Sequence, residues 1–177
     1  MSPNLSELLP ERPALLVLDF DGVLTDNMVY VDQNGTESVR CSRGDGLGLT
    51  LLSRAGFPVV ILSTEKNPVV SRRAEKLKLP CIQGVADKTA AFRALVAERG
   101  VAMESVVFVG NDVNDLGCLR LAGCGLVVAD AHPGVIGEAD GVLAGRGGEG
   151  AVREVCDALI KKMGFSSVYN ESDRPAV

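Results

Sequence analysis

The sequence lacks the features that mark membrane, secreted and cysteine-based metal-binding proteins. No apolar run approaches the roughly 20 residues that a membrane-spanning helix needs. The start, Met1 to Pro10, has no charged-then-apolar pattern of a secretion signal. The five cysteines include no C-x-x-C pair, which predicts reduced thiols rather than a zinc or redox site. We therefore expect a cytoplasmic protein with no membrane partner.

Basic charge and histidine are also scarce. The 177 residues carry a formal net charge of -5. Nucleic-acid-binding proteins rely on a broad cationic surface that neutralises phosphates, so we expect no nucleic-acid partner. His132 is the only histidine and lies beside Pro133 in an expected loop. We interpret it as a surface residue rather than a catalyst.

Short apolar runs rich in β-branched residues alternate with segments that have helical signals. The runs are expected strands at 15–20, 59–62, 106–109 and 125–128. This alternation predicts βαβ units, and hence an α/β, Rossmann-like fold with a parallel sheet and helices on both faces. Capping residues and apolar periodicity predict the intervening helices at 47–55, 67–77, 87–99 and 151–163.

Length and composition predict one domain. With 46% apolar residues, the chain can bury one substantial core but is short for two ordinary domains. We place this domain at 13–164, after an N-terminal extension at 1–12. The polar stretch 165–177 is expected to be a flexible tail.

One segment interrupts the alternation directly after the first strand. Two β-rich runs flank Asp32-Gln33-Asn34-Gly35, where Asn-Gly favours a tight reversal. This pattern predicts a β-hairpin at about 28–41. Because the segment is short of large apolar residues, we expect the hairpin to project from the domain.

Two carboxylates follow the first expected strand. Asp19 and Asp21 lie one residue apart at its carboxyl end, before Gly22. In an open parallel sheet the carboxyl ends of the strands border the ligand crevice. These acids are therefore candidate catalytic residues, although Asp-Gly is also common in ordinary turns.

A hydroxyl pair and a lysine follow the next two strand ends. Ser63 and Thr64 come after the second strand and can donate hydrogen bonds to a phosphoryl oxygen, or simply cap a helix. Lys88 follows the short run Cys81-Ile82 and can neutralise charge on a transferring group. Taken singly, such a lysine is usually solvated.

A third acidic cluster, Gly110-Asn111-Asp112-Val113-Asn114-Asp115, follows the strand at 106–109. It does not have the spacing of a calcium-binding EF loop. Magnesium prefers a few carboxylates together with water and phosphate oxygens, so Asp19 and Asp112 are plausible Mg²⁺ ligands. The alternative is a capped helix start.

Taken in this order, the four segments resemble the motifs of the haloacid dehalogenase superfamily. The corresponding residues are Asp19-x-Asp21, Ser63, Lys88 and Gly110-Asn111-Asp112-x-x-Asp115. The resemblance spans about 15–163. It implies a phosphatase that hydrolyses a small phosphate monoester with Mg²⁺ as cofactor.

The resemblance also implies a role for each residue. Asp19 would be the nucleophile that becomes an aspartyl phosphate, and Asp21 the general acid and base. Ser63 would hold the phosphoryl group, and Lys88 would pair with both the phosphate and Asp19. Asp19, Asp112 and the backbone carbonyl of Asp21 would bind the metal. Asn111 and Asp115 would have supporting roles, and for Asp115 the alternatives are orienting Lys88 or capping a helix.

The spacing of the motifs leaves no room for a cap domain. About 40 residues separate Asp21 from Ser63, and the hairpin and one helix use most of them. With Arg43-Gly44-Asp45-Gly46, this layout resembles the capless branch of 3-deoxy-octulosonate 8-phosphate phosphatases, nonulosonate 9-phosphate phosphatases and the C-terminal module of animal sialic-acid cytidylyltransferases. The branch implies a homotetramer in which a neighbour and its hairpin cover each site. A free-standing hairpin flap is the alternative.

Residues near the mouth of the site are candidates for substrate binding. Glu65 could accept hydrogen bonds from sugar hydroxyls, while a nearby cation pairs with a substrate carboxylate in the same site or in a neighbour's site. A solvated helix face is the alternative. The candidates are Thr64, Glu65, Arg72, Arg73 and Lys76.

The expected substrate is a small phosphorylated sugar acid. Octulosonate phosphatases usually carry Thr-Gly where this chain has Ser63-Thr64, and Glu65 is acidic, so we favour a nine-carbon 2-keto-3-deoxy acid phosphate. The alternatives are 3-deoxy-octulosonate 8-phosphate, and a non-catalytic oligomerisation module. The segment 145–150 does not match a P-loop, and we expect a flexible entry to the last helix, with Arg146 a candidate for substrate contact.

Overall fold

Six parallel strands form the centre of the fold. The computed structural model describes residues 4–169. The strands lie in the order β5-β4-β1-β6-β7-β8, so β1 is central and its neighbours come from different parts of the chain. Their bounds are β1 (Leu15–Leu18), β4 (Val59–Leu62), β5 (Cys81–Ile82), β6 (Val106–Gly110), β7 (Cys124–Val127) and β8 (Gly141–Val142).

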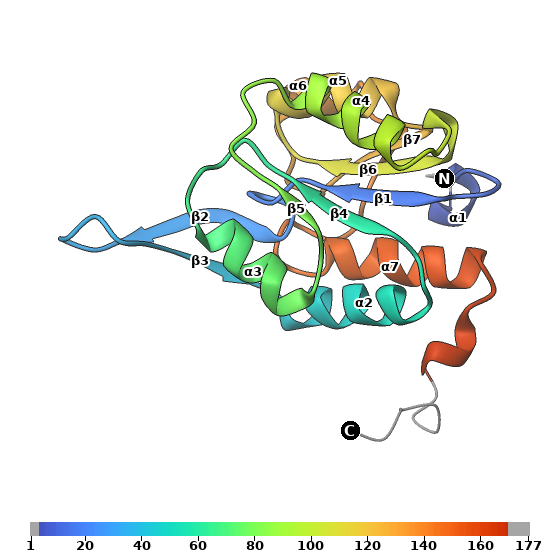
Figure 1. Ribbon diagram of the computed structural model, residues 1–177, viewed down its shortest axis with the longest axis horizontal. Helices are drawn as coiled ribbons and strands as arrows, with labels where there is room; N and C mark the ends of the chain where they lie inside the picture. Colours follow the sequence, from blue (N-terminus) through green and yellow to red (C-terminus); the bar gives the residue numbers. More distant parts are fainter. Residues whose placement is uncertain (1–3, 170–177) are drawn as a thin grey trace.

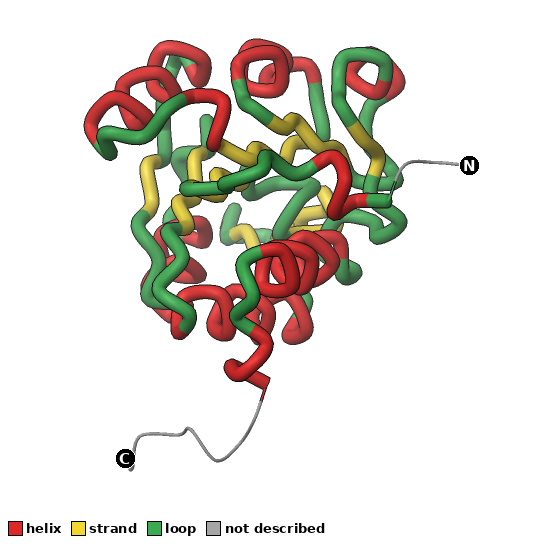
Figure 2. Tube along the Cα trace, turned by 90° about the vertical axis from the view of Figure 1, so that its right-hand side faces the viewer, coloured by secondary structure: helices red, strands yellow, loops and turns green. Residues whose placement is uncertain are grey.

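Helices cover both faces of this sheet (Figures 1 and 2). One face carries α2 (Arg43–Arg54), α3 (Val69–Leu77) and α7 (Ala151–Lys162). The other carries α4 (Lys88–Glu98), α5 (Leu116–Leu121) and α6 (Pro133–Ile136). The remaining short helices are α1 (Leu5–Leu8) and the 3-10 turns η1 (Met103–Ser105), η2 (Val113–Asp115) and η3 (Ser166–Tyr169). The predicted α/β fold with a parallel sheet is confirmed.

The core lies on both sides of the central strands. Every residue of β1, β4 and β6 is buried, because these strands are covered above and below. Phe92 of α4 meets Phe108 of β6 edge to face, with ring centroids 5.5 Å apart. This contact packs α4 against the strand that neighbours β1.

Helix α2 begins four residues earlier than the sequence predicted. Ser42 caps it by accepting the N–H of Asp45. Glycines near its start have low helix propensity, so the sequence did not predict this first turn. They allow close packing on α7, because a Cβ on Gly48 would lie 2.8 Å from Cδ of Arg153. The Asp45 carboxylate in turn accepts N–H groups from Arg153 and Gly150 at the start of α7. The segment Arg43-Gly44-Asp45-Gly46 thus holds the start of α2 against the start of α7 through hydrogen bonds.

The predicted hairpin is present as β2 (Thr25–Val31) and β3 (Glu37–Cys41). The Asp32 carboxylate accepts the N–H groups of Asn34 and Thr36, and Gly35 has a positive φ of 80°, which together make the reversal. The hairpin projects from the domain (Figure 1). Apolar side chains at Met28 and Tyr30 are each 65% exposed on it.

The regions outside the predicted domain pack against it. Leu9 is buried, and Nζ of Lys162 donates to the carbonyl oxygens of Ser6 and Leu9. At the other end, Tyr169 donates its hydroxyl to Asp157 of α7 at 2.8 Å. The rest of the expected tail, 170–177, lies outside the described residues. None of the helices between residues 4 and 169 is long and apolar enough to cross a membrane.

Candidate active site

A polar pocket of about 320 Å³ opens where β1, β4 and β6 end. These strands are neighbours in the sheet, and all three run in the same direction, so their following loops meet at one edge. The residues that line the pocket are Asp19, Asp21, Asn27, Ser63, Thr64, Asn111, Asp112, Val113 and Asn114. The structure thus brings together the side chains predicted at three strand ends.

Lys88 lies beneath this pocket as a buried bridge between two carboxylates. Its Nζ is 2.7 Å from Oδ1 of Asp19 and 2.6 Å from Oδ1 of Asp115. The lysine side chain is 2% exposed. Burial of an unpaired ammonium would be costly, and the two ion pairs offset that cost. Lys88 is therefore a fixed component of the site and not a solvated helix residue.

Asp115 does two jobs that the sequence left as alternatives. Its Oδ1 pairs with Lys88, while its Oδ2 accepts the backbone N–H groups of Asn111 and Asp112 at 2.8 and 3.3 Å. Asp112 in turn caps η2 by accepting the N–H of Val113. Asp115 therefore both orients Lys88 and holds the loop that follows β6.

The buried charges alter the protonation of Asp19 and Lys88. Burial, together with the charge of Asp115, raises the pKa of Asp19 to about 7, although Lys88 acts in the opposite direction. Burial disfavours the ammonium form of Lys88, but the charges of Asp19 and Asp115 outweigh this and raise its pKa. Lys88 thus remains cationic at neutral pH.

Asp21 has an environment that favours its protonated form. Burial raises its pKa, and the charges of Glu65 and Glu37 add to this effect, while Lys88 opposes it. A carboxyl group with a raised pKa holds its proton closer to neutral pH, which suits a general acid. Glu37 and Glu65 therefore lie close enough to Asp21 to affect its chemistry.

Gly22 is required by the crowding between the loops after β1 and β6. Its φ is 79°, and a Cβ on it would lie 2.0 Å from Nδ2 of Asn111. A side chain at this position would be strained and would displace the Asn111 amide. The glycine thus lets the two loops approach each other.

The loop after β4 is ordered by its own side chains. Ser63 is buried, and its Oγ accepts the N–H of Glu65 at 3.0 Å. Oε1 of Glu65 accepts the N–H groups of Lys66 and Asn67 at 2.6 and 2.7 Å. Thr64 is exposed on the pocket wall. Glu65 is therefore held in place beside the pocket through one of its two carboxylate oxygens.

Known proteins share this arrangement over most of the chain. Residues 71–153 match a family model described as haloacid dehalogenase-like hydrolase. The 3-deoxy-D-manno-octulosonate 8-phosphate phosphatase of Escherichia coli K12 is 38% identical over 155 residues, which cover 87% of this chain and 82% of the relative. The chain belongs to the haloacid dehalogenase-like hydrolases. It is accordingly a phosphoric monoester hydrolase.

Two similar solved structures of such phosphatases contain a divalent metal ion. The enzyme from Moraxella catarrhalis, in complex with magnesium, phosphate and KDO, has a TM-score of 0.86 and 30% identity, covering 93% of this chain and 97% of that one. The cobalt-bound enzyme from Haemophilus influenzae has a TM-score of 0.85 and 34% identity, covering 92% and 95%. Between β1 and β4 this chain has the hairpin and α2 alone, which is the capless form of the hydrolase fold.

The pocket residues fit the divalent cation that such hydrolases use. Asp19, Asp21 and Asp112 line the same pocket, and Lys88 is paired with Asp19. Two carboxylates with room for water and phosphate are what Mg²⁺ takes, rather than a protein cage. Between residues 4 and 169 no three His, Cys, Asp or Glu side chains form a metal-binding group. A cation here would also lower the pKa of Asp19 and keep it ionised.

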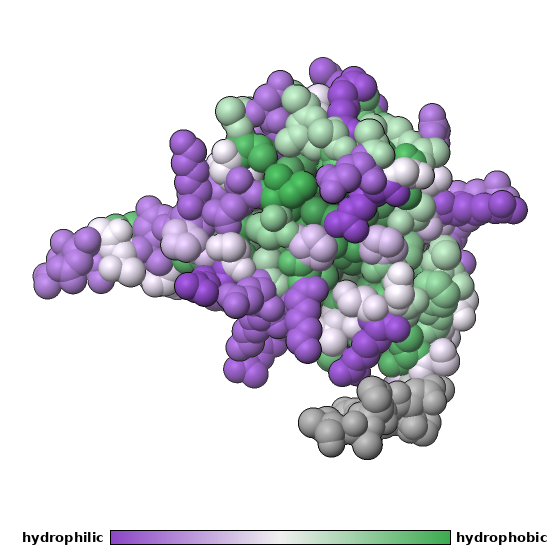
Figure 3. Space-filling view, in the orientation of Figure 1, coloured by the Kyte–Doolittle hydropathy of each residue, from purple (hydrophilic) through white to green (hydrophobic). Residues whose placement is uncertain are grey.

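Four of the five predicted substrate-binding residues do not line the pocket, and one of them, Glu65, lies beside it. Arg72, Arg73 and Lys76 line a separate groove of about 770 Å³ between β3, α2 and α3. Arg73 donates to the carbonyl oxygen of Ser42 at 3.1 Å, and Arg72 pairs with Glu75 on the helix surface. Figure 3 shows hydrophilic side chains gathered beside the hairpin over α3. Within one copy, these cations do not reach Asp19.

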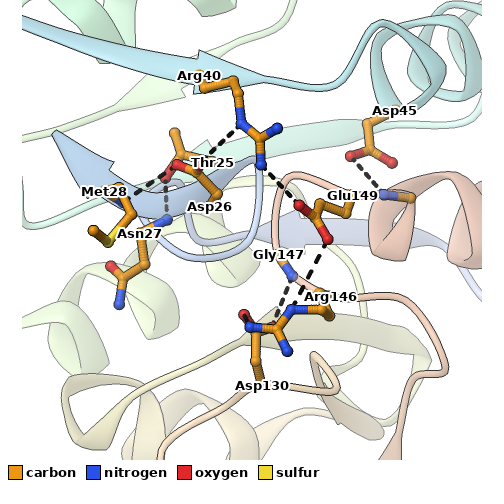
Figure 4. A network of polar contacts seen from close by, with 11 residues as sticks. Thr25, Asp26, Asn27, Met28, Arg40, Asp45, Asp130, Arg146, Gly147 and Glu149 are labelled. Carbon is orange, nitrogen blue, oxygen red and sulfur yellow. Dashed lines mark hydrogen bonds and ion pairs between the residues drawn. The ribbon is translucent and has the colours of Figure 1, made fainter. Parts of the chain in front are cut away.

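The glycine-rich segment 145–150 is packed tightly against the loop after β1. A Cβ on Gly147 would lie 2.0 Å from the carbonyl oxygen of Gly22, and Gly148 donates its N–H to the carbonyl oxygen of Val23 at 2.9 Å. Arg146 pairs with Asp130 at 3.3 Å instead of entering the pocket (Figure 4). The segment thus packs on the loop after β1. The sequence predicted a flexible entry to the last helix, but the structure shows a segment held in place by these contacts.

The sequence missed three residues of the pocket wall. Val113 and Asn114 lie within the motif at 110–115, but their side chains carried no separate signal. Asn27 comes from β2, and only the path of the hairpin brings it to the site.

His132 is exposed and caps α6 by accepting the N–H of Gly134, as expected of a surface residue.

Proposed function

We propose that this hydrolase is a Mg²⁺-dependent phosphatase that acts on a 2-keto-3-deoxy sugar acid phosphate through an aspartyl phosphate. The observation that carries the proposal is the buried Asp19–Lys88–Asp115 bridge under a polar pocket. Lys88 fixes the Asp19 carboxylate at the end of β1, with its other oxygen free to face the pocket. A structural role alone would not need this buried charge.

In the first step Oδ of Asp19 attacks phosphorus in line with the ester oxygen. A P–O bond forms to Asp19 as the bond to the leaving alcohol breaks, and Asp21 gives its proton to that alcohol. Lys88 and Ser63 stabilise the negative charge on the equatorial phosphoryl oxygens. Both are buried at the pocket, so they need little rearrangement.

In the second step water hydrolyses the aspartyl phosphate. Asp21, now ionised, accepts a proton from the water as its oxygen attacks phosphorus, and Asp19 is released as a carboxylate. The raised pKa of Asp21 suits both steps, since the proton is held before the first and taken up in the second. Phosphate then leaves the pocket.

Mg²⁺, when bound, supplies positive charge that neutralises the phosphoryl oxygens and orients them toward the nucleophile. We assign its protein ligands as the carboxylates of Asp19 and Asp112 and the backbone carbonyl of Asp21. Asn111 and Asp115 act as supports, because they position the loop that carries Asp112. Removing the metal with a chelator should abolish phosphate release, and Mg²⁺ should restore it.

The acid class of the substrate is supported by the charges around the site. Glu65 keeps one oxygen for sugar hydroxyls, since its Oε1 is held by backbone N–H groups. One of the groove cations Arg72, Arg73 and Lys76 pairs with the carboxylate of a substrate bound in a neighbouring subunit's site. Glu65 favours a nine-carbon acid, whereas the names of the relatives favour 3-deoxy-octulosonate 8-phosphate as a second candidate.

We also propose that the hairpin assembles the protein as a homotetramer. Apolar side chains at Met28, Val29, Tyr30 and Val31 are 53–65% exposed along β2, and burial against another copy would remove them from water. Introducing lysine at Val29 and Tyr30 should reduce the molar mass measured by light scattering. A tetramer that survives both charges would contradict this assignment.

Phosphate release from a panel of esters tests the proposed function. The panel contains eight- and nine-carbon 2-keto-3-deoxy acid phosphates, neutral sugar phosphates and p-nitrophenyl phosphate, each with Mg²⁺ or with chelator. We expect the acid phosphates to have the highest kcat/KM. If no ester were hydrolysed in a Mg²⁺-dependent way, the result would favour a non-catalytic assembly module. A preference for neutral sugar phosphates would reject a sugar acid phosphate as the substrate.

A further inference from the structure

Asn27 brings the first strand of the hairpin to the wall of the pocket. It lines the same cavity as Asp19 and Asp21, although it belongs to β2. The pairing of β2 with β3 shifts register between Thr25 and Val29, and such bulges turn a side chain out of the regular alternation. Asn27 itself has a φ of 62°, in the left-handed region.

The backbone on both sides of Asn27 is anchored. Oγ1 of Thr25 accepts the N–H groups of Gly22 at 3.0 Å and of Asn27 at 3.2 Å. Asp26 accepts the N–H of Met28 and pairs with Nε of Arg40 at 2.8 Å (Figure 4). Asn27 is therefore held in its left-handed conformation by its neighbours.

This conformation does not itself require the amide side chain. Asparagine tolerates the left-handed region, but glycine adopts it with no steric penalty. Figure 4 shows the side-chain amide of Asn27 directed away from the Arg40 ion pairs. Within residues 4–169 the hydrogen bond of Asn27 is made by its backbone N–H and not by this side chain. Asn27 is exposed, and its left-handed backbone could be adopted by glycine as well as by asparagine, so the amide is available to a ligand in the pocket.

The Asn27 side chain lies in the same pocket as Asp21 and close to the residue that follows it. A Cβ on Gly22 would be 3.2 Å from Cγ of Asn27, and Gly22 directly follows Asp21. Because Asp21 protonates the leaving oxygen in the proposed mechanism, a group beside it faces the alcohol rather than the phosphate. A neutral amide has two donors and an acceptor, which suits hydroxyl groups better than a charged partner.

We propose that Asn27 is a specificity-determining residue whose side-chain amide hydrogen-bonds to a hydroxyl group on the carbon chain of the leaving alcohol. This inference rests on the proposed phosphatase function and adds to it a contact near the ester. It predicts that the enzyme favours polyhydroxylated alcohols over aryl or alkyl ones. The recognised group is the hydroxyl nearest the reacting bond.

The variant Asn27→Gly tests this contact, because glycine keeps the left-handed backbone and removes only the side chain. We would measure kcat/KM for the sugar phosphate that the wild type hydrolyses fastest and for p-nitrophenyl phosphate, whose leaving group carries no second hydroxyl. Loss of a neutral hydrogen bond should lower the ratio of the two about fivefold or more. Asn34→Gly, the same change at the exposed tip of the hairpin, should leave that ratio unchanged.

Two results would overturn the inference. If kcat/KM fell equally for both esters, Asn27 would act only by shaping the loop. If kcat/KM were unchanged for both, Asn27 would not contact the substrate. The wild-type panel decides the proposed function separately. If sugar acid phosphates are poor substrates, the Asn27 ratio is still measured on the best hydroxylated ester of the panel.

Discussion

The pocket at the end of β1 and the groove beside the hairpin differ in size, in burial and in how their charged side chains are paired. The pocket is formed by loops from neighbouring strands, and Asp19, Ser63 and Lys88 are buried with their partners fixed. The groove is more than twice as large, and its cations are exposed or partly exposed on α3. Arg72, for example, pairs only with its helical neighbour Glu75, and both side chains are more than 70% exposed.

This difference separates chemistry from recognition. Phosphoryl transfer needs charges held at fixed positions, which a buried sheet edge provides. Recognition of a larger acid needs a surface that the isolated subunit leaves open. The following predictions test that separation, because changes to the buried charged residues at the pocket should affect all substrates, and changes in the groove only some.

The largest effect is expected from Asp19→Asn. The amide cannot attack phosphorus, so kcat should fall by about a thousandfold or more for every ester, as for other nucleophile replacements. Lys88 keeps its ion pair with Asp115, so the fold should persist. Phosphate release and circular dichroism measure the two outcomes. A rate close to the wild type would reject Asp19 as the nucleophile.

Asp115→Asn should have the next largest effect, on stability. It leaves Lys88 with one carboxylate and weakens the hold on the loop after β6, which should lower the free energy of unfolding by about 3 kcal/mol. Urea unfolding measures this change. The control is Glu138→Gln, which removes an exposed ion pair with Arg120 and should lower the free energy of unfolding far less. Similar losses in the two variants would contradict a special role for the buried bridge.

Arg73→Ala tests whether the groove takes part in recognition. We expect kcat/KM for a sugar acid phosphate to fall about tenfold more than that for p-nitrophenyl phosphate, because a charge-assisted hydrogen bond to a carboxylate is lost. Arg73 also donates to the carbonyl oxygen of Ser42, so thermal unfolding must be measured alongside. If both esters lose the same factor, the groove supports the fold and not the substrate.

Glu75→Gln should have the smallest effect. It removes the exposed pair with Arg72, which contributes under about 0.5 kcal/mol, so the free energy of unfolding should hardly change. Arg72 is then free of its helical partner, and kcat/KM for acid substrates should change by less than about twofold. A large change in either quantity would show that the groove is more organised than its exposure indicates.

Prediction from the sequence succeeded where local pattern and position in the sheet agree. The strand Val59–Leu62 and the helix over 87–99 were predicted closely, because buried β-branched residues and an Asp87 cap act locally. The early start of α2 was missed. Glycines weaken its helical signal, while the packing that stabilises it comes from α7, more than 100 residues away.

The candidate site was predicted in part for the same reason. Asp19, Ser63 and Asp112 follow strands whose ends must meet in a parallel sheet, so their convergence could be inferred. Asn27 gave no such signal, because its place depends on a bulge and on a positive φ. Arg73 lies on the predicted helix, but helical spacing could not say that α2 and β3 would enclose it in a groove of its own.

The sequence by itself determined the alternation of strands and helices, and with it the edge of the sheet at which the acids and the hydroxyl lie. Those features follow from the order of apolar and polar residues along the chain. Only the tertiary structure decided that Lys88 is a buried bridge between Asp19 and Asp115. The reason is physical: an ion pair of this kind depends on burial and on distances between segments 27 and 69 residues apart, which no local pattern contains.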